Sequence, residues 1–174
     1  KKIKEIDINF TIPSFRKNTF RKYHSINTSI LYDLGCYPFS LIFYFNFNFE
    51  NYKVFYKTKN KKLNLIKVLF SSKRIKFNII LATNQTYENS VNIKYEDNLN
   101  YYLNHFFYGK KIKKINYIHE LNQKKKVFII NDKNLFENIL KFSNKKLLEL
   151  SRKQFSITKD YLTSLNLIKK YIKL

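Results

Sequence analysis

Three histidines and one cysteine are the residues of this sequence best suited to metal binding or nucleophilic catalysis. His24, His105 and His119 lack the i, i+4 spacing that places two imidazoles on one metal ion, and none lies near Cys36 in the sequence. Only twelve acidic residues are present, and they are dispersed. We therefore expect no catalytic group, no metal site and no cofactor, and we predict that the protein is not an enzyme.

Glycine is as scarce as the reactive side chains. Only Gly35 and Gly109 are present, so a glycine-rich loop that cradles phosphates is not expected. The single cysteine, Cys36, cannot form an internal disulfide, and a lone thiol usually packs as a small apolar side chain. These residues indicate a reducing compartment but no particular reaction.

Positive charge is the strongest remaining signal. The chain has 34 Lys and Arg residues against 12 Asp and Glu, a net charge of +22. Such an excess repels itself in an isolated compact protein and indicates a polyanionic partner, usually nucleic acid, because neutralised phosphates release counterions. The alternative is that codon bias alone inflates the lysine count, although that bias does not explain the rarity of acidic residues. The residues predicted to bind an RNA backbone are Arg16, Lys17, Arg21, Lys22, Lys73, Arg74, Lys110, Lys111, Lys113, Lys114, Lys124, Lys125 and Lys126.

The wider composition indicates a nucleotide bias. There are 17 Phe, 14 Tyr and 22 Asn residues, but one Ala, two Gly, two Pro and no Met or Trp. Folding does not demand this usage, because Ala is a better helix former than Asn and Arg binds phosphate with better geometry than Lys. Phe, Tyr, Ile, Asn and Lys have A/T-rich codons, so the usage is typical of mitochondrial or plastid genomes and of some AT-rich nuclear genomes.

The apolar pattern divides the chain into three parts. Residues 1–38 mix polar and basic residues with isolated apolar ones and predict a basic extended arm. In residues 39–131 apolar and polar residues alternate as they do in strands, and this region is predicted to be a β-rich mixed core domain. Residues 132–174 carry helical stripes and form a predicted helical C-terminal segment.

Alternation within the core predicts antiparallel hairpins. Five phenylalanines and Leu41 occupy every second position over 39–49 and predict a strand, and residues 52–58 return as its partner. Residues 63–70 fit either a strand or a short helix. Further strands are predicted over 73–81, 91–95, 112–118 and 126–130, the last two as a second hairpin.

Helical spacing occurs at 99–106, where Gly109 would end the helix, and twice near the end of the chain. Asp132 can cap the first C-terminal helix, and the second follows Thr158. The sequence therefore predicts an α+β fold: a small mixed domain with antiparallel hairpins, a basic N-terminal extension and two C-terminal helices.

Targeting and membrane signals are not expected. Residues 1–20 lack the apolar core of a signal peptide, and they do not resemble a transit peptide. No stretch reaches the roughly 20 apolar residues that a membrane-spanning helix needs. We expect a protein without a membrane span.

The Lys, Asn, Phe, Tyr and Ile usage, the basic segment 15–23, the α+β core and the basic helical end resemble ribosomal proteins encoded by AT-rich organellar genomes, most like those of protist mitochondria. The resemblance implies a structural constituent of the mitochondrial ribosome that binds ribosomal RNA and neighbouring ribosomal proteins and takes no small-molecule substrate. It implies a mitochondrial matrix location, with the plastid as second choice. The alternative is a soluble accessory subunit of a mitochondrial respiratory or ATP synthase complex.

Overall fold

A computed structural model describes residues 2–14, 30–60, 62–107, 112–119, 124–131 and 144–172. For 112–119, 124–131 and most of 144–151 it describes the backbone alone. The helices are α1 (Ile30–Asp33), α2 (Cys36–Tyr44) and α4 (Asn144–Lys169). The strands are β1 (Ile3–Ile12), β2 (Glu50–Lys59), β3 (Lys62–Ser72), β4 (Ile75–Thr83), β5 (Glu88–Tyr95), β6 (Leu99–Asn104), β7 (Ile112–His119) and β8 (Lys124–Asn131).

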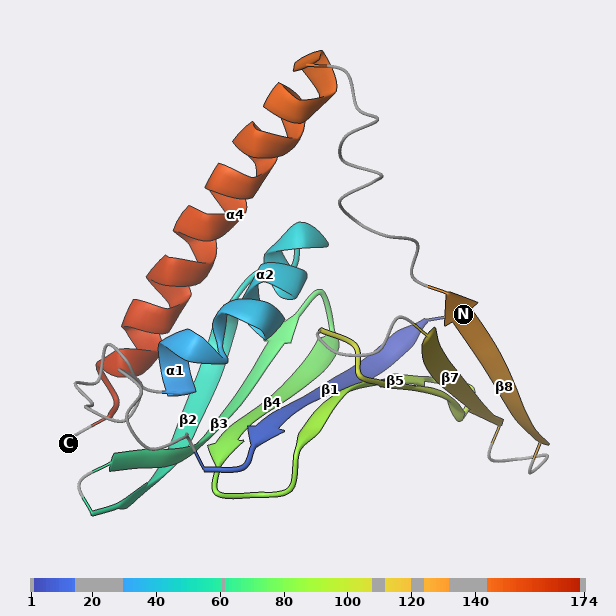
Figure 1. Cartoon of the computed structure of the whole chain (residues 1–174), viewed down its shortest axis with the longest axis horizontal. Helices are drawn as coiled ribbons and strands as arrows, with labels where there is room; N and C mark the ends of the chain where they lie inside the picture. Colours follow the sequence, from blue (N-terminus) through green and yellow to red (C-terminus); the bar gives the residue numbers. More distant parts are fainter. Residues whose placement is uncertain are drawn as a thin grey trace.

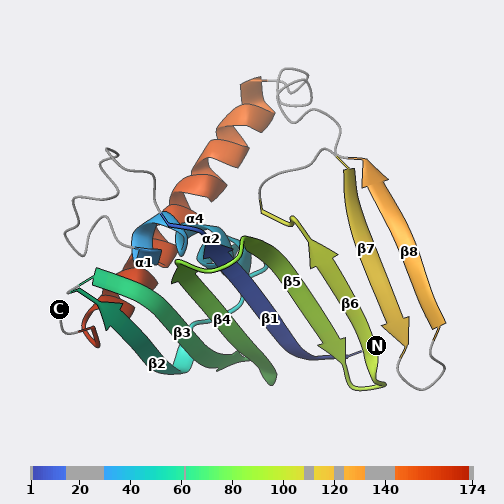
Figure 2. The same cartoon turned by 60° about the horizontal axis from the view of Figure 1, so that its bottom comes forward.

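The strands form one sheet in the order β2-β3-β4-β1-β5-β6-β7-β8 (Figure 2). β1 lies inside the sheet, parallel to β4 and antiparallel to β5. The other neighbouring strands pair as antiparallel hairpins. The first strand in the sequence therefore inserts between two hairpin-linked groups that form later in the chain.

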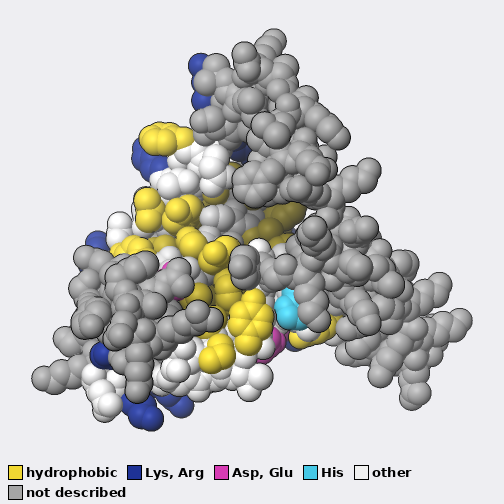
Figure 3. Space-filling model, viewed as in Figure 1, with side chains coloured by type: hydrophobic (Ala, Val, Ile, Leu, Met, Phe, Trp, Pro, Cys, Tyr) yellow, Lys and Arg dark blue, Asp and Glu magenta, His cyan; other side chains and the backbone are white. Residues whose placement is uncertain are grey.

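One face of the sheet is covered by helices (Figure 1). The short helices α1 and α2 lie on this face, and α4 packs against both of them. Alternation along β1 turns Ile6, Ile8 and Phe10 to this face, where they are buried. Leu165 and Ile168 of α4 are fully buried in the same core. Hydrophobic side chains gather between α4 and the sheet on the side seen in Figure 3.

The segment 39–49 is not the strand that its alternating phenylalanines predict. α2 ends in a Schellman motif, in which the amide of Phe47 donates to the carbonyl of Ile42 (3.1 Å) and the amide of Asn46 donates to that of Phe43 (3.0 Å). Asn46 takes the left-handed conformation, with φ of 55°, that this cap requires. The prediction failed because Leu41, Ile42 and Phe43 make the run apolar on every side, and a short apolar run fits a buried helix as well as a strand.

The helix predicted over 99–106 is also wrong. Of the residues spaced for a helix, Leu99 and Leu103 lie on one side of β6, whereas Tyr102 lies on the other side, opposite Asn92 of β5. The helical spacing therefore does not correspond to one face of the observed strand. Tyrosine suits a half-buried pleated surface, and sheet pairing outweighed the weak local helical spacing.

The N-terminal residues differ from the extended arm expected over 1–38, because Ile3–Ile12 pair on both sides within the sheet. At the other end, α4 continues through Thr158 without the predicted break. Residues 132–143, where the first C-terminal helix was expected to begin, lie outside the described residues.

The α+β fold class is confirmed, and the strands predicted over 73–81 and 91–95 and the hairpin over 112–130 are present as β4, β5 and β7–β8. The ambiguous segment 63–70 is part of β3. The helices that the structure describes do not have the length and apolar character needed to cross a membrane.

Candidate functional site

An open pocket of about 230 Å³ lies on the helical side of the sheet, where α2, α4 and the segment after β6 meet. We call it the tyrosine pocket. It is lined by Tyr37, Ser40, Leu41, Tyr44, Phe106, Phe107, Gln154 and Ile157. Small-molecule sites are typically concave and mostly apolar with a few placed polar groups, and this pocket has that make-up.

Three residues of α2 that carry hydroxyl groups line the pocket. Tyr37, Ser40 and Tyr44 are three and then four residues apart, a spacing that places them on one side of a helix. Gln154 adds an amide from α4. Residues with hydroxyl and amide groups therefore line the pocket together with apolar side chains.

The ring of Tyr37 is held by two phenylalanines. Its centroid lies 5.2 Å from that of Phe10 in an edge-to-face arrangement and 6.0 Å from that of Phe107. These contacts favour one ring orientation. Because 39% of Tyr37 is exposed, the residue is packed without being closed off from a ligand.

A buried asparagine positions the opposite wall. Asn89 of β5 is fully buried, and its carbonyl and side-chain oxygens accept hydrogen bonds from the amides of Phe106 (3.2 Å) and Phe107 (2.9 Å). His105, directly before these residues, has a φ of 54° that turns the chain out of β6. The two phenylalanine side chains are thus carried on a backbone that the sheet itself fixes.

Positive charge lies at the edge of the pocket. The ammonium group of Lys153 lies 4.0 Å from the centroid of the Tyr44 ring, a cation–π contact between α4 and α2. A cation in this place favours ligands that carry negative charge.

An apolar cavity of about 310 Å³ adjoins the tyrosine pocket between α2 and the sheet. Leu41 and Phe106 line both spaces, so these two side chains form the boundary between them.

The opposite face of the sheet carries a charged cluster. The ammonium group of Lys94 lies 2.8 Å from Oδ2 of Asp7 and 3.3 Å from Oε1 of Glu5, and the amide of Asn78 donates to Oδ1 of Asp7 (3.2 Å). Burial acts to raise the pKa of Asp7, but the hydrogen bonds from Lys94 and Asn78 and the charge of Lys94 outweigh it and hold that pKa below its usual value. The hydrogen bond to Asp7 raises the pKa of Lys94. Both changes favour the ion pair, which is a structural link between β1 and β5.

Cys36 begins α2, and its thiol donates a weak hydrogen bond to the carbonyl of Asp33 at 3.5 Å. Burial, and next the charge of Asp33, raise the pKa of the Cys36 thiol. It is therefore protonated at neutral pH and a poor nucleophile. Among the residues that the structure describes, no three His, Cys, Asp or Glu side chains gather as a metal site requires.

The predicted RNA-binding residues that the structure describes lie at separate places along the sheet. Lys73 and Arg74 make the turn between β3 and β4, whereas Lys113 and Lys114 lie on β7 and Lys124–Lys126 on β8. β8 is five strands away from β4, about 24 Å at the usual strand spacing. Arg16, Lys17, Arg21, Lys22, Lys110 and Lys111 lie outside the described residues.

The sequence analysis missed the polar residues of the tyrosine pocket. The signal was present as the spacing of Tyr37, Ser40 and Tyr44, but the strand predicted over 39–49 placed Ser40 and Tyr44 on its polar side and left Tyr37 outside the strand. Phe106, Gln154 and Ile157 carried no local signal, because only the packing of distant segments brings them to α2.

No family model and no curated protein matches the sequence. Solved structures match its fold. KijD10, a 3-ketoreductase from Actinomadura kijaniata in complex with NADP and TDP-benzene, matches with a TM-score of 0.69 and 14% identity over 97% of this chain and 52% of its own. The yvaA protein of Bacillus subtilis, assigned as an oxidoreductase, matches with a TM-score of 0.60 and 11% identity over 98% and 56%. A Yersinia pestis protein assigned as an oxidoreductase matches with a TM-score of 0.67 and 7% sequence identity, over 99% of this chain and 56% of its own length.

This chain therefore spans about half the length of the proteins it resembles. The likeness contradicts the resemblance to organellar ribosomal proteins, since these proteins with the same fold are oxidoreductases. The predictions of a ribosomal or accessory-subunit role, of ribosomal RNA and protein partners and of no small-molecule substrate are corrected by this likeness. It also contradicts the expectation, drawn from the scarcity of reactive side chains, that the protein is not an enzyme. Composition misled because nucleotide bias changes which apolar and cationic residues fill a fold without changing the fold.

The described residues do not fit the NADP that KijD10 holds. A dinucleotide's pyrophosphate is usually bound at a glycine-rich turn between a parallel strand and a helix. Gly35 instead joins two helices with φ of −67°, and Gly109 lies outside the described residues. The one parallel pair among the described strands is β1 with β4, and the sequence between β1 and α1, residues 13–29, contains no glycine.

Proposed function

We propose that this chain forms the substrate-binding half of an oxidoreductase that reduces a small carbonyl compound, with the hydroxyl of Tyr37 as the proton donor. The observation that carries the proposal is the likeness to a 3-ketoreductase over 97% of the chain at a TM-score of 0.69. The tyrosine pocket supports it with hydroxyl groups on a preformed apolar wall.

Reduction of a ketone to an alcohol adds a hydride, which carries two electrons, to the carbonyl carbon and a proton to the oxygen. A placed proton donor accelerates such a step by about 100- to 10,000-fold. Tyr37 suits this role because its ring is packed against Phe10 while the residue remains partly exposed at the pocket. Ser40, one helical turn along α2, is placed as a second hydrogen-bond donor for the substrate.

The electrons must come from a reductant held elsewhere. Because the described residues provide no dinucleotide turn, a nicotinamide cofactor would be bound by other residues of a longer protein or by a second protein. The chain's own residues then bind the ketone, orient its oxygen and exclude water from the apolar wall.

The test is ketone reduction by the native protein, purified from its own cells with any companion polypeptide and followed by the loss of reduced nicotinamide absorbance. Tyr37→Phe keeps the ring and removes the hydroxyl, so kcat should fall about 100-fold or more while substrate affinity changes little. Tyr161→Phe on α4 is the matched control, because Tyr161 does not line the pocket, and its kcat should be unchanged.

Two results would contradict the proposal. One is the absence of nicotinamide-dependent reduction of any ketone in a broad panel. The other is a Tyr37→Phe variant with the turnover of the parent protein. The mitochondrial location indicated by composition stays a prediction, which imaging of the tagged protein would test.

A further inference from the structure

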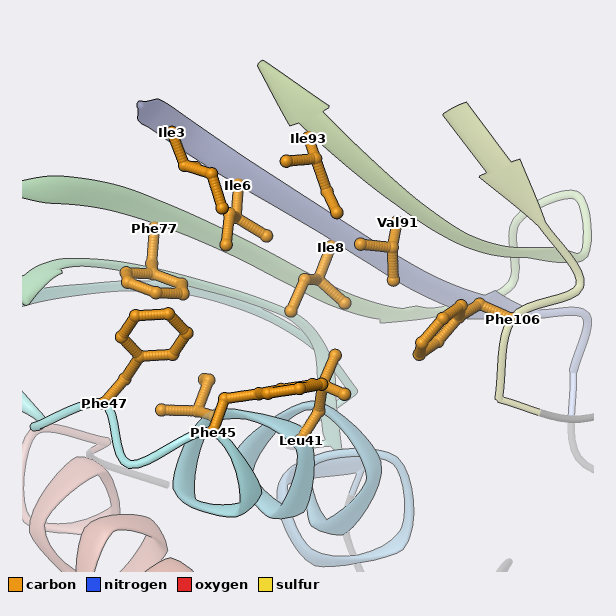
Figure 4. Close-up of a pocket in the computed structure, with 11 residues that line it drawn as sticks. Ile3, Ile6, Ile8, Leu41, Phe45, Phe47, Phe77, Val91, Ile93 and Phe106 are labelled. Atoms are coloured by element: carbon orange, nitrogen blue, oxygen red, sulfur yellow. The ribbon is translucent and has the colours of Figure 1, made fainter. Parts of the chain in front are cut away.

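The apolar cavity beside the tyrosine pocket has no polar lining at all (Figure 4). Ile6 and Ile8 project into it from β1, Val91 and Ile93 from β5, and Leu41 from α2. Its complete lining is Ile3, Ile6, Ile8, Leu41, Ile42, Phe45, Phe47, Phe77, Val91, Ile93 and Phe106.

The end of α2 explains why this space is open. The Schellman motif turns the chain sharply at Asn46, so that Phe47 folds back onto Phe77 with ring centroids 5.1 Å apart. Phe45, at the corner, lines the cavity and is 57% exposed. The cavity therefore has an exposed apolar side chain at Phe45, and it shares Leu41 and Phe106 with the tyrosine pocket.

Water is a poor occupant of such a space. A buried water needs two to four polar partners, and the lining side chains supply none. The cavity, at about 310 Å³, is roughly twice the size of an engineered apolar cavity of about 150 Å³ that binds benzene. A hydrocarbon group of about ten carbons is matched to this volume.

We infer that the apolar cavity binds the hydrocarbon part of the substrate, whose carbonyl group lies in the tyrosine pocket. The inference rests on the proposed function and deepens it by naming the substrate class, a ketone that carries an alkyl, prenyl or aryl group. The substrate crosses the boundary between Leu41 and Phe106, with its polar end near Tyr37 and its apolar end against Ile8 and Val91.

The test compares two methyl ketones, methyl octyl ketone and methyl ethyl ketone, by calorimetric titration of the full chain. Each buried methylene strengthens binding about fourfold, so the six additional methylenes should give at least about a 100-fold difference in Kd even with incomplete burial. Ile93→Phe fills the cavity and should weaken binding of methyl octyl ketone about tenfold or more. Leu41→Phe narrows the passage and should act in the same direction.

The matched control is Ile80→Phe on β4, which makes the same change in size on the opposite face of the sheet and should leave both affinities unchanged. Circular dichroism and thermal unfolding show whether each variant folds, and Leu41→Phe provides the test if Ile93→Phe does not. Equal affinity for the two ketones, or full affinity in a folded cavity-filled variant, would overturn the inference.

The two proposals fail separately. If methyl octyl ketone binds in the cavity but Tyr37→Phe keeps full turnover in the native protein, the proton-donor role is wrong and the cavity site stands. If Tyr37 is required but chain length has no effect on Kd, the cavity site is wrong and the reductase role stands.

Discussion

Lys94 of β5 lies opposite Glu5 of β1 but reaches diagonally to Asp7, with its ammonium nitrogen 2.8 Å from a carboxylate oxygen of Asp7. Asn78 of β4 and Asn92 of β5 donate to the same carboxylate at 3.2 and 3.4 Å. Asp7 therefore links three strands on the face of the sheet opposite the helices. The Asp7 side chain is only 15% exposed, and these partners stabilise its negative charge against the cost of burial.

A double-mutant cycle of Asp7→Asn and Lys94→Gln should give a coupling free energy of about 0.5–1 kcal/mol. The value is modest because the Lys94 side chain is 40% exposed and solvent screens the pair. Urea unfolding of the four proteins at neutral pH measures it. A coupling indistinguishable from zero would show that the ion pair adds nothing to stability.

Acid should remove the contribution of Asp7. The pKa of Asp7 is lowered in the folded protein. The ionised carboxylate therefore stabilises the folded state above the unfolded pKa of about 3.9, and this stabilisation is lost as the pH falls through the pKa of the folded state. The difference in unfolding free energy between the parent and Asp7→Asn should therefore shrink below about pH 4. Asp160→Asn, at an exposed position of α4, is the control.

Gly35→Ala should destabilise the junction of α1 and α2. A Cβ atom at Gly35 would collide with the backbone oxygen of Leu31 and lie 3.0 Å from Cδ2 of Leu165. Since φ is −67°, the cost comes from crowding against backbone and core, and we expect about 1–3 kcal/mol. Urea unfolding measures the change, and unchanged stability would mean that α1 moves aside freely.

Arg74→Gly should stabilise the protein. Lys73 and Arg74 form the two-residue turn between β3 and β4 with φ of 49° and 69°, the left-handed region in which glycine is favoured. Relief of that strain at Arg74 should raise the free energy of unfolding by about 1 kcal/mol. Arg152→Gly, within α4, should instead lower it by about 1 kcal/mol. A loss of stability in Arg74→Gly would indicate that the arginine side chain makes a contact that outweighs the strain.

Cys36 should react slowly with iodoacetamide at neutral pH. Burial and the nearby Asp33 raise the pKa of its thiol, so little thiolate is present. We expect alkylation at least about tenfold slower than in the urea-unfolded chain, with the folded rate rising toward alkaline pH. Mass spectrometry of timed samples gives both rates, and equal rates would contradict the burial.

Much of the sheet could be predicted from the sequence. Residues 73–81 and 91–95 alternate cleanly because one side faces the core and the other faces solvent, and each is a strand in the structure. The helical C-terminal segment could be predicted for the same reason, because its apolar residues form a single stripe along an otherwise polar helix. Where a segment has a single buried side, its period reports its secondary structure.

The tyrosine pocket could not be predicted, because it depends on which way residues 39–49 fold. Both a strand and a helix bury the phenylalanines of that run, and the choice was made by Phe39 and Ile42 packing between the sheet and α4. Once α2 is a helix, Tyr37 and Ser40 share a side and meet Phe106 and Gln154 from distant parts of the chain.

Residue types and local periodicity therefore determined the α+β class, the hairpin over 112–130 and the large positive charge. The tertiary structure decided that Ile3–Ile12 enter the sheet, that 39–49 contain a helix, and that hydroxyl groups line one pocket beside an apolar cavity. The physical reason is the range of the interactions: periodicity reflects contact with a core of any kind, whereas a site requires side chains far apart in sequence to meet at one place.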